Sequence, residues 1–110
     1  MQILARETGT ITIFDVSGEI DLLNSPQVRQ SLLREIQENR TPCVMVNLSR
    51  VRYLYSSGIA SLVEALKASR DLGSRFVLFG LGDSARAALQ LSRLIKVFEV
   101  YDNEVQALAS

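Results

Sequence analysis

Two adjacent serines and a glycine, Ser56-Ser57-Gly58, are the residues of this chain best placed for chemistry. They follow an apolar run that predicts a strand and precede an apolar periodicity that predicts an amphipathic helix. The first N–H groups of a helix have no intrahelical acceptor, and together with the helix dipole they favour a phosphate group. Such a turn is a favourable place for a phosphate group. Taken alone, however, the pattern favours a plain helix cap, because serine is a preferred N-cap residue.

Enzymatic chemistry is poorly supported by the residues of this chain. The chain has no histidine, so it can form neither a Ser-His-Asp triad nor an imidazole metal site. Cys43 is the only cysteine and lies in an apolar run, where it is expected to be a small buried side chain. Glu19 and Asp21 alternate along an extended segment, which is poor geometry for a pair of catalytic carboxylates. Gly80 and Gly82 lack the lysine of a nucleotide-binding loop. We therefore expect no enzyme, no cofactor and no metal.

Length and charge favour a protein partner. The 110 residues predict a single domain over residues 1–110. Twelve basic and twelve acidic residues cancel, so no net field attracts nucleic acid or an anionic membrane. The first residues show no signal-peptide pattern, and no apolar run is long enough to cross a bilayer. The expected location is the cytoplasm.

Strands and helices alternate through most of the chain, which predicts an α/β fold. Strands are expected at 2–6, 11–16, 43–48, 75–79 and 97–100, with a further uncertain strand at 18–22. Helices are expected at 26–39, from the serine turn to 71, at 84–91 and at 103–108. Ser25 followed by Pro26 indicates an N-cap and the first helical residue. A short connection with glycine makes the first two strands an antiparallel hairpin, whereas the later strands are expected to be parallel, so the sheet is mixed.

Three sequence blocks at a characteristic spacing resemble a known family. Gly18-Glu19-Ile20-Asp21, Val46-Asn47-Leu48-Ser49-Arg50-Val51 and Ser56-Ser57-Gly58-Ile59-Ala60-Ser61-Leu62 are similar to the STAS domains of bacterial anti-sigma factor antagonists, as is the closing Gly80-Leu81. Each block alone is a weak signal, but all of them in order are fairly specific. The resemblance covers nearly the whole chain. It implies one STAS domain with four to five strands and three to four helices, packed mainly on one face of the sheet.

The resemblance also implies a function in regulatory binding. In such partner-switching pathways an anti-sigma factor, which is also a serine kinase, binds the unphosphorylated antagonist and thereby frees a sigma factor. The kinase phosphorylates the first serine of the turn, here Ser56, with Ser57 as the second choice, and a serine phosphatase resets the cycle. The partner-binding residues implied are Glu19, Asp21, Tyr55, Ser56, Ser57, Gly58, Ile59 and Ser61. For Glu19 and Asp21 a solvated loop is an equal alternative. Tyr53 is expected in the core, and Tyr55 is a candidate exposed anchor.

Tyr55 is the one clear departure from the family pattern, which usually has aspartate before the serine. A small carboxylate is replaced by a large aromatic ring with a weakly acidic hydroxyl. This departure leaves a second function open, that of a STAS accessory subunit that braces the ATPase of a phospholipid-transport ABC complex without a phosphorylation cycle. A third possibility is a subunit of a large stress-sensing complex.

Overall fold

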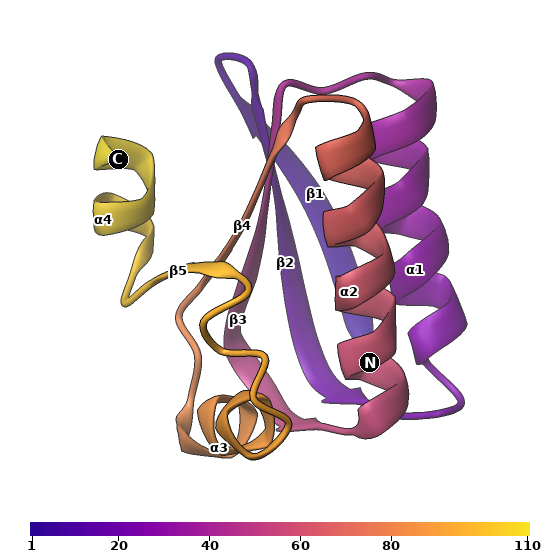
Figure 1. Ribbon diagram of the computed structural model, residues 1–110, viewed down its shortest axis with the longest axis vertical. Helices are drawn as coiled ribbons and strands as arrows, with labels where there is room; N and C mark the ends of the chain where they lie inside the picture. The colour runs from indigo at the N-terminus through magenta and orange to yellow at the C-terminus, as the bar shows by residue number, and fades with distance from the viewer.

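The computed structural model describes residues 1–110 as a five-stranded sheet with the strand order β1-β2-β3-β4-β5 (Figure 1). The first two strands are antiparallel and all other neighbours are parallel, so the predicted mixed sheet with an N-terminal hairpin is confirmed. The strands are β1 (Gln2–Thr8), β2 (Ile11–Ile20), β3 (Cys43–Leu54), β4 (Arg75–Phe79) and β5 (Glu99–Tyr101). The helices are α1 (Ser25–Leu33), which continues into a π-helical turn η1 (Arg34–Glu38), then α2 (Ser56–Asp71), α3 (Asp83–Leu91) and α4 (Glu104–Ala109).

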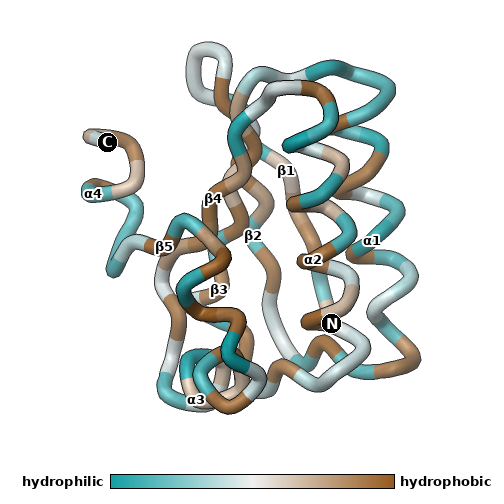
Figure 2. The backbone as a smooth tube through the Cα atoms, viewed as in Figure 1, coloured by the Kyte–Doolittle hydropathy of each residue, from teal (hydrophilic) through white to brown (hydrophobic).

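The helices lie mainly on one face of the sheet, as expected for the fold. Helices α1 and α2 run side by side over one face, whereas α4 lies beyond the other (Figure 1). The main core fills the space beneath α1, α2 and α3, and a smaller core on the opposite face centres on Met45 and Val77, under Ala107 of α4. In Figure 2 the hydrophobic residues recur along the strands and on the sheet-facing sides of α1 and α2. None of the helices is both long and apolar enough to cross a membrane.

The apolar stripe of α1 shows why the helices pack against the sheet. Val28, Leu32 and Ile36 recur every four residues, so they share one face of a helix, and all three are buried. The helical segment begins one residue earlier than predicted. Asn24 occupies the N-cap position and Ser25 is already helical, so the prediction of Ser25 as the cap is wrong.

Strand β3 extends to Leu54, and the predicted end at residue 48 is wrong. Its register with β2 shifts twice, between Asp15 and Ser17 and between Gly18 and Glu19. Each shift adds one residue to β3, so the positions facing the main core change from a spacing of two to a spacing of three: Val44, Val46, Leu48, Val51 and Leu54. Of the uncertain strand predicted at 18–22, residues 18–20 form the last part of β2 and pair with the extended β3, whereas residues 21 and 22 lie in the loop that follows.

Ion pairs attach the last elements to the sheet. The guanidinium of Arg6 on β1 hydrogen-bonds the carboxylates of Asp15 and Glu104, with 2.6 Å between its Nε and Asp15 Oδ2. These hydrogen bonds hold the pKa of both carboxyl groups below their usual range. Arg75 and Glu99 form the equivalent pair between β4 and β5, with 2.9 Å between Arg75 Nε and Glu99 Oε1. Through these contacts β1 holds α4, and β4 holds β5.

Candidate functional site

The turn between β3 and α2 lies at the edge of the sheet where the parallel strands β2 and β3 both end. The backbone N–H of Tyr55 donates to the carbonyl of Ile20 at 3.1 Å, which joins the two strand ends. The β2–α1 loop and the β3–α2 turn are therefore neighbours, although more than thirty residues separate them in sequence. This is the edge at which ligand sites form in open parallel sheets.

The two serines occupy the first two positions of α2. Tyr55 is the N-cap residue, with extended backbone, and no side chain caps the helix. The hydroxyl of Ser56 is exposed and has no hydrogen-bond partner in the protein, whereas Ser57 is half-buried. Since the first turn of α2 carries no acidic residue either, its free N–H groups and the positive end of the dipole are not neutralised by the chain itself.

Gly58 and Ser61 hold this turn in place from inside. A Cβ atom at Gly58 would lie 2.6 Å from Ile20 Cγ2 and 2.9 Å from the Ile20 carbonyl oxygen, so only glycine fits there. The Ser61 hydroxyl is buried and bonds the carbonyls of Ser25 and Ser57 at 3.2 and 3.1 Å. Both residues were expected at a partner surface, but the structure places them within the fold, where they fix the first turn of α2 against α1 and β2.

The β2–α1 loop presents two leucines that the sequence reasoning missed. The Asp21 carboxylate accepts the N–H groups of Leu23 and Asn24 at 3.1 and 2.9 Å, and the Asn24 amide donates to the Glu19 carbonyl at 3.1 Å. This bonded turn leaves Leu22 and Leu23 81% and 89% exposed. The available signal was the pair of adjacent leucines directly before the residues that start the helix.

Tyr53 and Tyr55 extend the same surface. Their side chains are 50% and 48% exposed, and their ring centroids lie 6.2 Å apart. The prediction that Tyr53 belongs to the core is wrong, because the second register shift turns Leu54 toward the core and leaves Tyr53 outside. Glu19 lies opposite Tyr53 in the register and approaches Arg52 at 3.9 Å.

The side chains around the two serines line a shallow hollow. Its lining residues are Asp21, Leu22, Tyr55, Ser56 and Ser57. Ile59 is half-buried behind it, packed against the main core. Nowhere in the chain do three side chains of the metal-ligating types gather closely enough to hold an ion. What remains is a nucleophilic hydroxyl, unneutralised helix N–H groups and an apolar rim.

Comparison with known proteins gives one consistent family. The STAS domain model matches residues 2–107. The chain is 33% identical over 105 residues to the anti-sigma-B factor antagonist of Listeria monocytogenes, covering 94% of this chain and 90% of that protein. It is 27% identical to the anti-sigma F factor antagonist of Paenibacillus polymyxa, covering 98% and 92%. The crystal structure of an anti-sigma factor antagonist from Mycobacterium paratuberculosis superposes with a TM-score of 0.87 at 26% identity, covering 98% of this chain and 91% of that one.

The space at Gly58 is testable by adding one methyl group. We expect Gly58→Ala to lower the free energy of unfolding by about 1–3 kcal/mol, because overpacking forces the Ile20 backbone or α2 to shift. Urea denaturation measures the change. Gly82→Ala is a comparison in which a Cβ meets nothing within 4 Å, so only the loss of glycine at the N-cap of α3 contributes. A Gly58→Ala variant as stable as the parent chain would show that the turn accommodates a side chain.

The uncapped start of α2 predicts a stabilising substitution. Tyr55→Asp should raise the free energy of unfolding by roughly 0.5–1 kcal/mol, because the carboxylate can accept helix N–H groups and complements the dipole. Tyr55→Asn separates these two effects, since asparagine caps without a charge. A stability of Tyr55→Asp at or below that of the parent chain contradicts the assignment of Tyr55 as an unsatisfied N-cap.

Proposed function

The chain belongs to the STAS domain family, and we propose that residues 1–110 form one such domain that acts as an anti-sigma factor antagonist. In this proposal it binds an anti-sigma serine kinase in a partner-switching pathway regulated by serine phosphorylation, and it works in the cytoplasm, where sigma factors act. The names of its relatives support the regulatory role. The observation that carries the proposal is the exposed, unpartnered hydroxyl of Ser56 at the uncapped start of α2.

We take the kinase-binding surface to be the exposed side chains around that hydroxyl. This switch surface comprises Leu22, Leu23, Tyr55 and Ser56, with Asp21 and Ser57 lining the hollow between them. Full burial of one leucine side chain contributes about 1.5–3 kcal/mol. Two leucines and a tyrosine beside the serine are therefore enough to anchor a protein partner, whose own apolar groups would cover them.

Phosphate on Ser56 would act on this surface through its charge. It would add about −1.5 to −2 charges at neutral pH beside apolar contacts. In the free domain, water and the N–H groups of α2 would stabilise that charge. In the complex the partner would have to desolvate it, and a loss of about 3 kcal/mol lowers affinity roughly a hundredfold. The antagonist would then release the kinase until a serine phosphatase restores the hydroxyl.

Tyr55 favours a second candidate function. With an aromatic ring at the N-cap position, the chain lacks the carboxylate that usually precedes the phosphorylated serine in this family. A STAS accessory subunit of a phospholipid-transport ABC complex needs the apolar surface but no phosphate cycle. In that case Leu22, Leu23 and Tyr55 would contact the transporter ATPase.

Phosphorylation by a cognate kinase tests the main proposal. The full chain is incubated with ATP and each anti-sigma serine kinase of the same genome, and its intact mass is measured. One added phosphate is expected, and it should be lost in Ser56→Ala but retained in Ser57→Ala. Absence of phosphate with every kinase, combined with a stable complex with a transporter ATPase, supports the second candidate instead.

The exposed leucines give an independent test of the surface. Leu22→Asp and Leu23→Asp should each weaken kinase binding, measured by calorimetry, by roughly tenfold to a hundredfold, since about 1.4 kcal/mol corresponds to tenfold. Stability should stay nearly unchanged because both side chains already face solvent. Val105→Asp is the matched control, an apolar side chain that is 78% exposed on α4. Undiminished binding by the leucine variants would place the contact elsewhere.

A further inference from the structure

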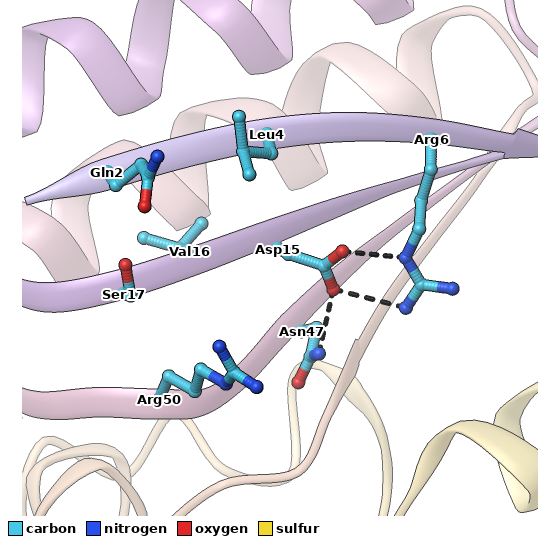
Figure 3. A pocket seen from close by; sticks show the side chains of 8 residues that line it. All are labelled: Gln2, Leu4, Arg6, Asp15, Val16, Ser17, Asn47 and Arg50. Atoms are coloured by element: carbon cyan, nitrogen blue, oxygen red, sulfur yellow. Dashed lines mark hydrogen bonds and ion pairs between the residues drawn. The ribbon is translucent and has the colours of Figure 1, made fainter.

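The face of the sheet opposite α1 and α2 is only partly covered. Helix α4 packs over the smaller core, where Ile13, Met45 and Val77 are buried. Beyond that core the same face has no helix over it, and it forms a hollow of about 290 Å³. The lining residues, shown in Figure 3, are Gln2, Leu4, Arg6, Asp15, Val16, Ser17, Asn47 and Arg50.

One row of this hollow consists of hydrogen-bond donors on three successive strands. Gln2 on β1 lies opposite Ser17 on β2, and Ser17 lies opposite Arg50 on β3. Neighbouring strands are about 4.8 Å apart, so the three side chains form a line about 10 Å long. None of them has a hydrogen bond or an ion pair within the protein, and the guanidinium of Arg50 extends freely into the hollow (Figure 3).

A β-bulge directs Arg50 to this face. In regular pairing the residue opposite Ser17 would be Ser49, but the first register shift inserts one residue in β3. The shift turns Arg50 to the open face beside Asn47, and it lets the following Val51 face the main core. Bulges that re-aim a side chain are frequent beside functional sites.

The side chains of the next row of the hollow are hydrogen-bonded to one another within the protein. The Asp15 carboxylate accepts hydrogen bonds from the Arg6 guanidinium and from the Asn47 amide, the latter at 2.8 Å. Arg6 also hydrogen-bonds Glu104. Arg6 is thus occupied by two carboxylates, whereas Arg50 forms no hydrogen bond or ion pair, although its charge also helps to lower the pKa of Asp15. Leu4 is 57% exposed and supplies an apolar wall.

We propose that this hollow binds a small organic oxyanion, a carboxylate or phosphate monoester with a short apolar part. The anionic group would lie over Ser17, where it would accept hydrogen bonds from the Arg50 guanidinium, the Ser17 hydroxyl and the Gln2 amide. Guanidinium groups bind carboxylate and phosphate through paired hydrogen bonds. The apolar part would lie against Leu4. The size of the hollow, at the lower end for ligand sites, limits the ligand to a few heavy atoms beyond the anionic group.

NMR titration of the full, ¹⁵N-labelled chain tests the proposal at constant ionic strength. The probes are sodium phosphate, sodium acetate and sodium butyrate, with sodium chloride as the reference salt. Saturable shifts are expected at the amides of Ser17 and Arg50, with dissociation constants of about 1–10 mM for so small a ligand. Tighter binding of butyrate than of acetate identifies a carboxylate with an apolar tail, and tighter binding of phosphate identifies a phosphate monoester.

Variants test whether the chemical-shift changes come from binding to the row of Gln2, Ser17 and Arg50. Arg50→Gln should weaken binding at least about tenfold, because it removes a charge-assisted pair of hydrogen bonds. Arg50→Lys, which keeps the charge but not the fork, should be intermediate, and it substitutes for the first variant if that one misfolds. Arg34→Gln is the control, since Arg34 is also exposed, lies on η1 and pairs only with Glu38. Shifts that follow chloride, or that persist unchanged in both Arg50 variants, overturn the proposal. None of these results depends on Ser56, so the proposed kinase binding stands or falls separately.

Discussion

The contact between Gly58 and the end of β2 is the constraint on which the switch surface depends. Without a Cβ at Gly58, α2 begins directly against Ile20, and the Tyr55 N–H reaches the Ile20 carbonyl. That close approach places the β2–α1 loop beside the helix start. Ser61 secures the same junction from the α1 side through the carbonyl of Ser25. The exposed leucines and the exposed serine are therefore held at fixed positions by buried residues that no partner needs to touch.

The two bulges of β3 have a comparable role for the rest of the site. An unbulged β3 would alternate faces regularly, so Arg50 would face the main core and Val51 the open face. With one extra residue at each bulge, the apolar side chains Val51 and Leu54 still reach the core. Their polar and aromatic neighbours Arg50 and Tyr53 turn outward. One irregular strand thus supplies both the free guanidinium of the open face and the aromatic rim of the switch surface.

The regular parts of this fold were predictable from sequence, and the irregular parts were not. Repeats of four residues such as Val28, Leu32 and Ile36 are typical of a helix with one buried face, so α1 followed from the pattern. The packing of the helices mainly on one face of the sheet was implied by the family resemblance. The end of β3 did not, because a bulge breaks the two-residue alternation by which a strand is recognised. The same break made Tyr53 look like a core residue.

For the candidate site, the sequence likewise predicted which residue types are present but not where each side chain lies. Serine pairs before a helix indicate where a phosphate is favoured, so Ser56 and Ser57 could be located at the start of α2. Whether a nearby residue faces a partner depends on packing across distant strands, which no local pattern contains. Gly58 and Ser61 are close to the serines in sequence and lie inside; Leu22 and Leu23 are far away in sequence and lie outside. The motif therefore located the turn at the start of α2 but did not indicate which neighbouring side chains are exposed.

A rigid, preformed surface also fits the kind of control proposed for this chain. The turn before α2 is fixed by backbone hydrogen bonds, a buried serine and a glycine contact, so a phosphate on Ser56 has no loose segment to rearrange. The effect of the phosphate must therefore be local. In the free domain the helix N–H groups stabilise the phosphate by about 0.3–1 kcal/mol, whereas in a complex the phosphate loses its hydration. Because no side chain of the domain occupies those N–H groups, the free state keeps its advantage. The larger contribution to the proposed release is the hydration that the phosphate loses in the complex, so release by charge does not depend on whether tyrosine or aspartate precedes Ser56.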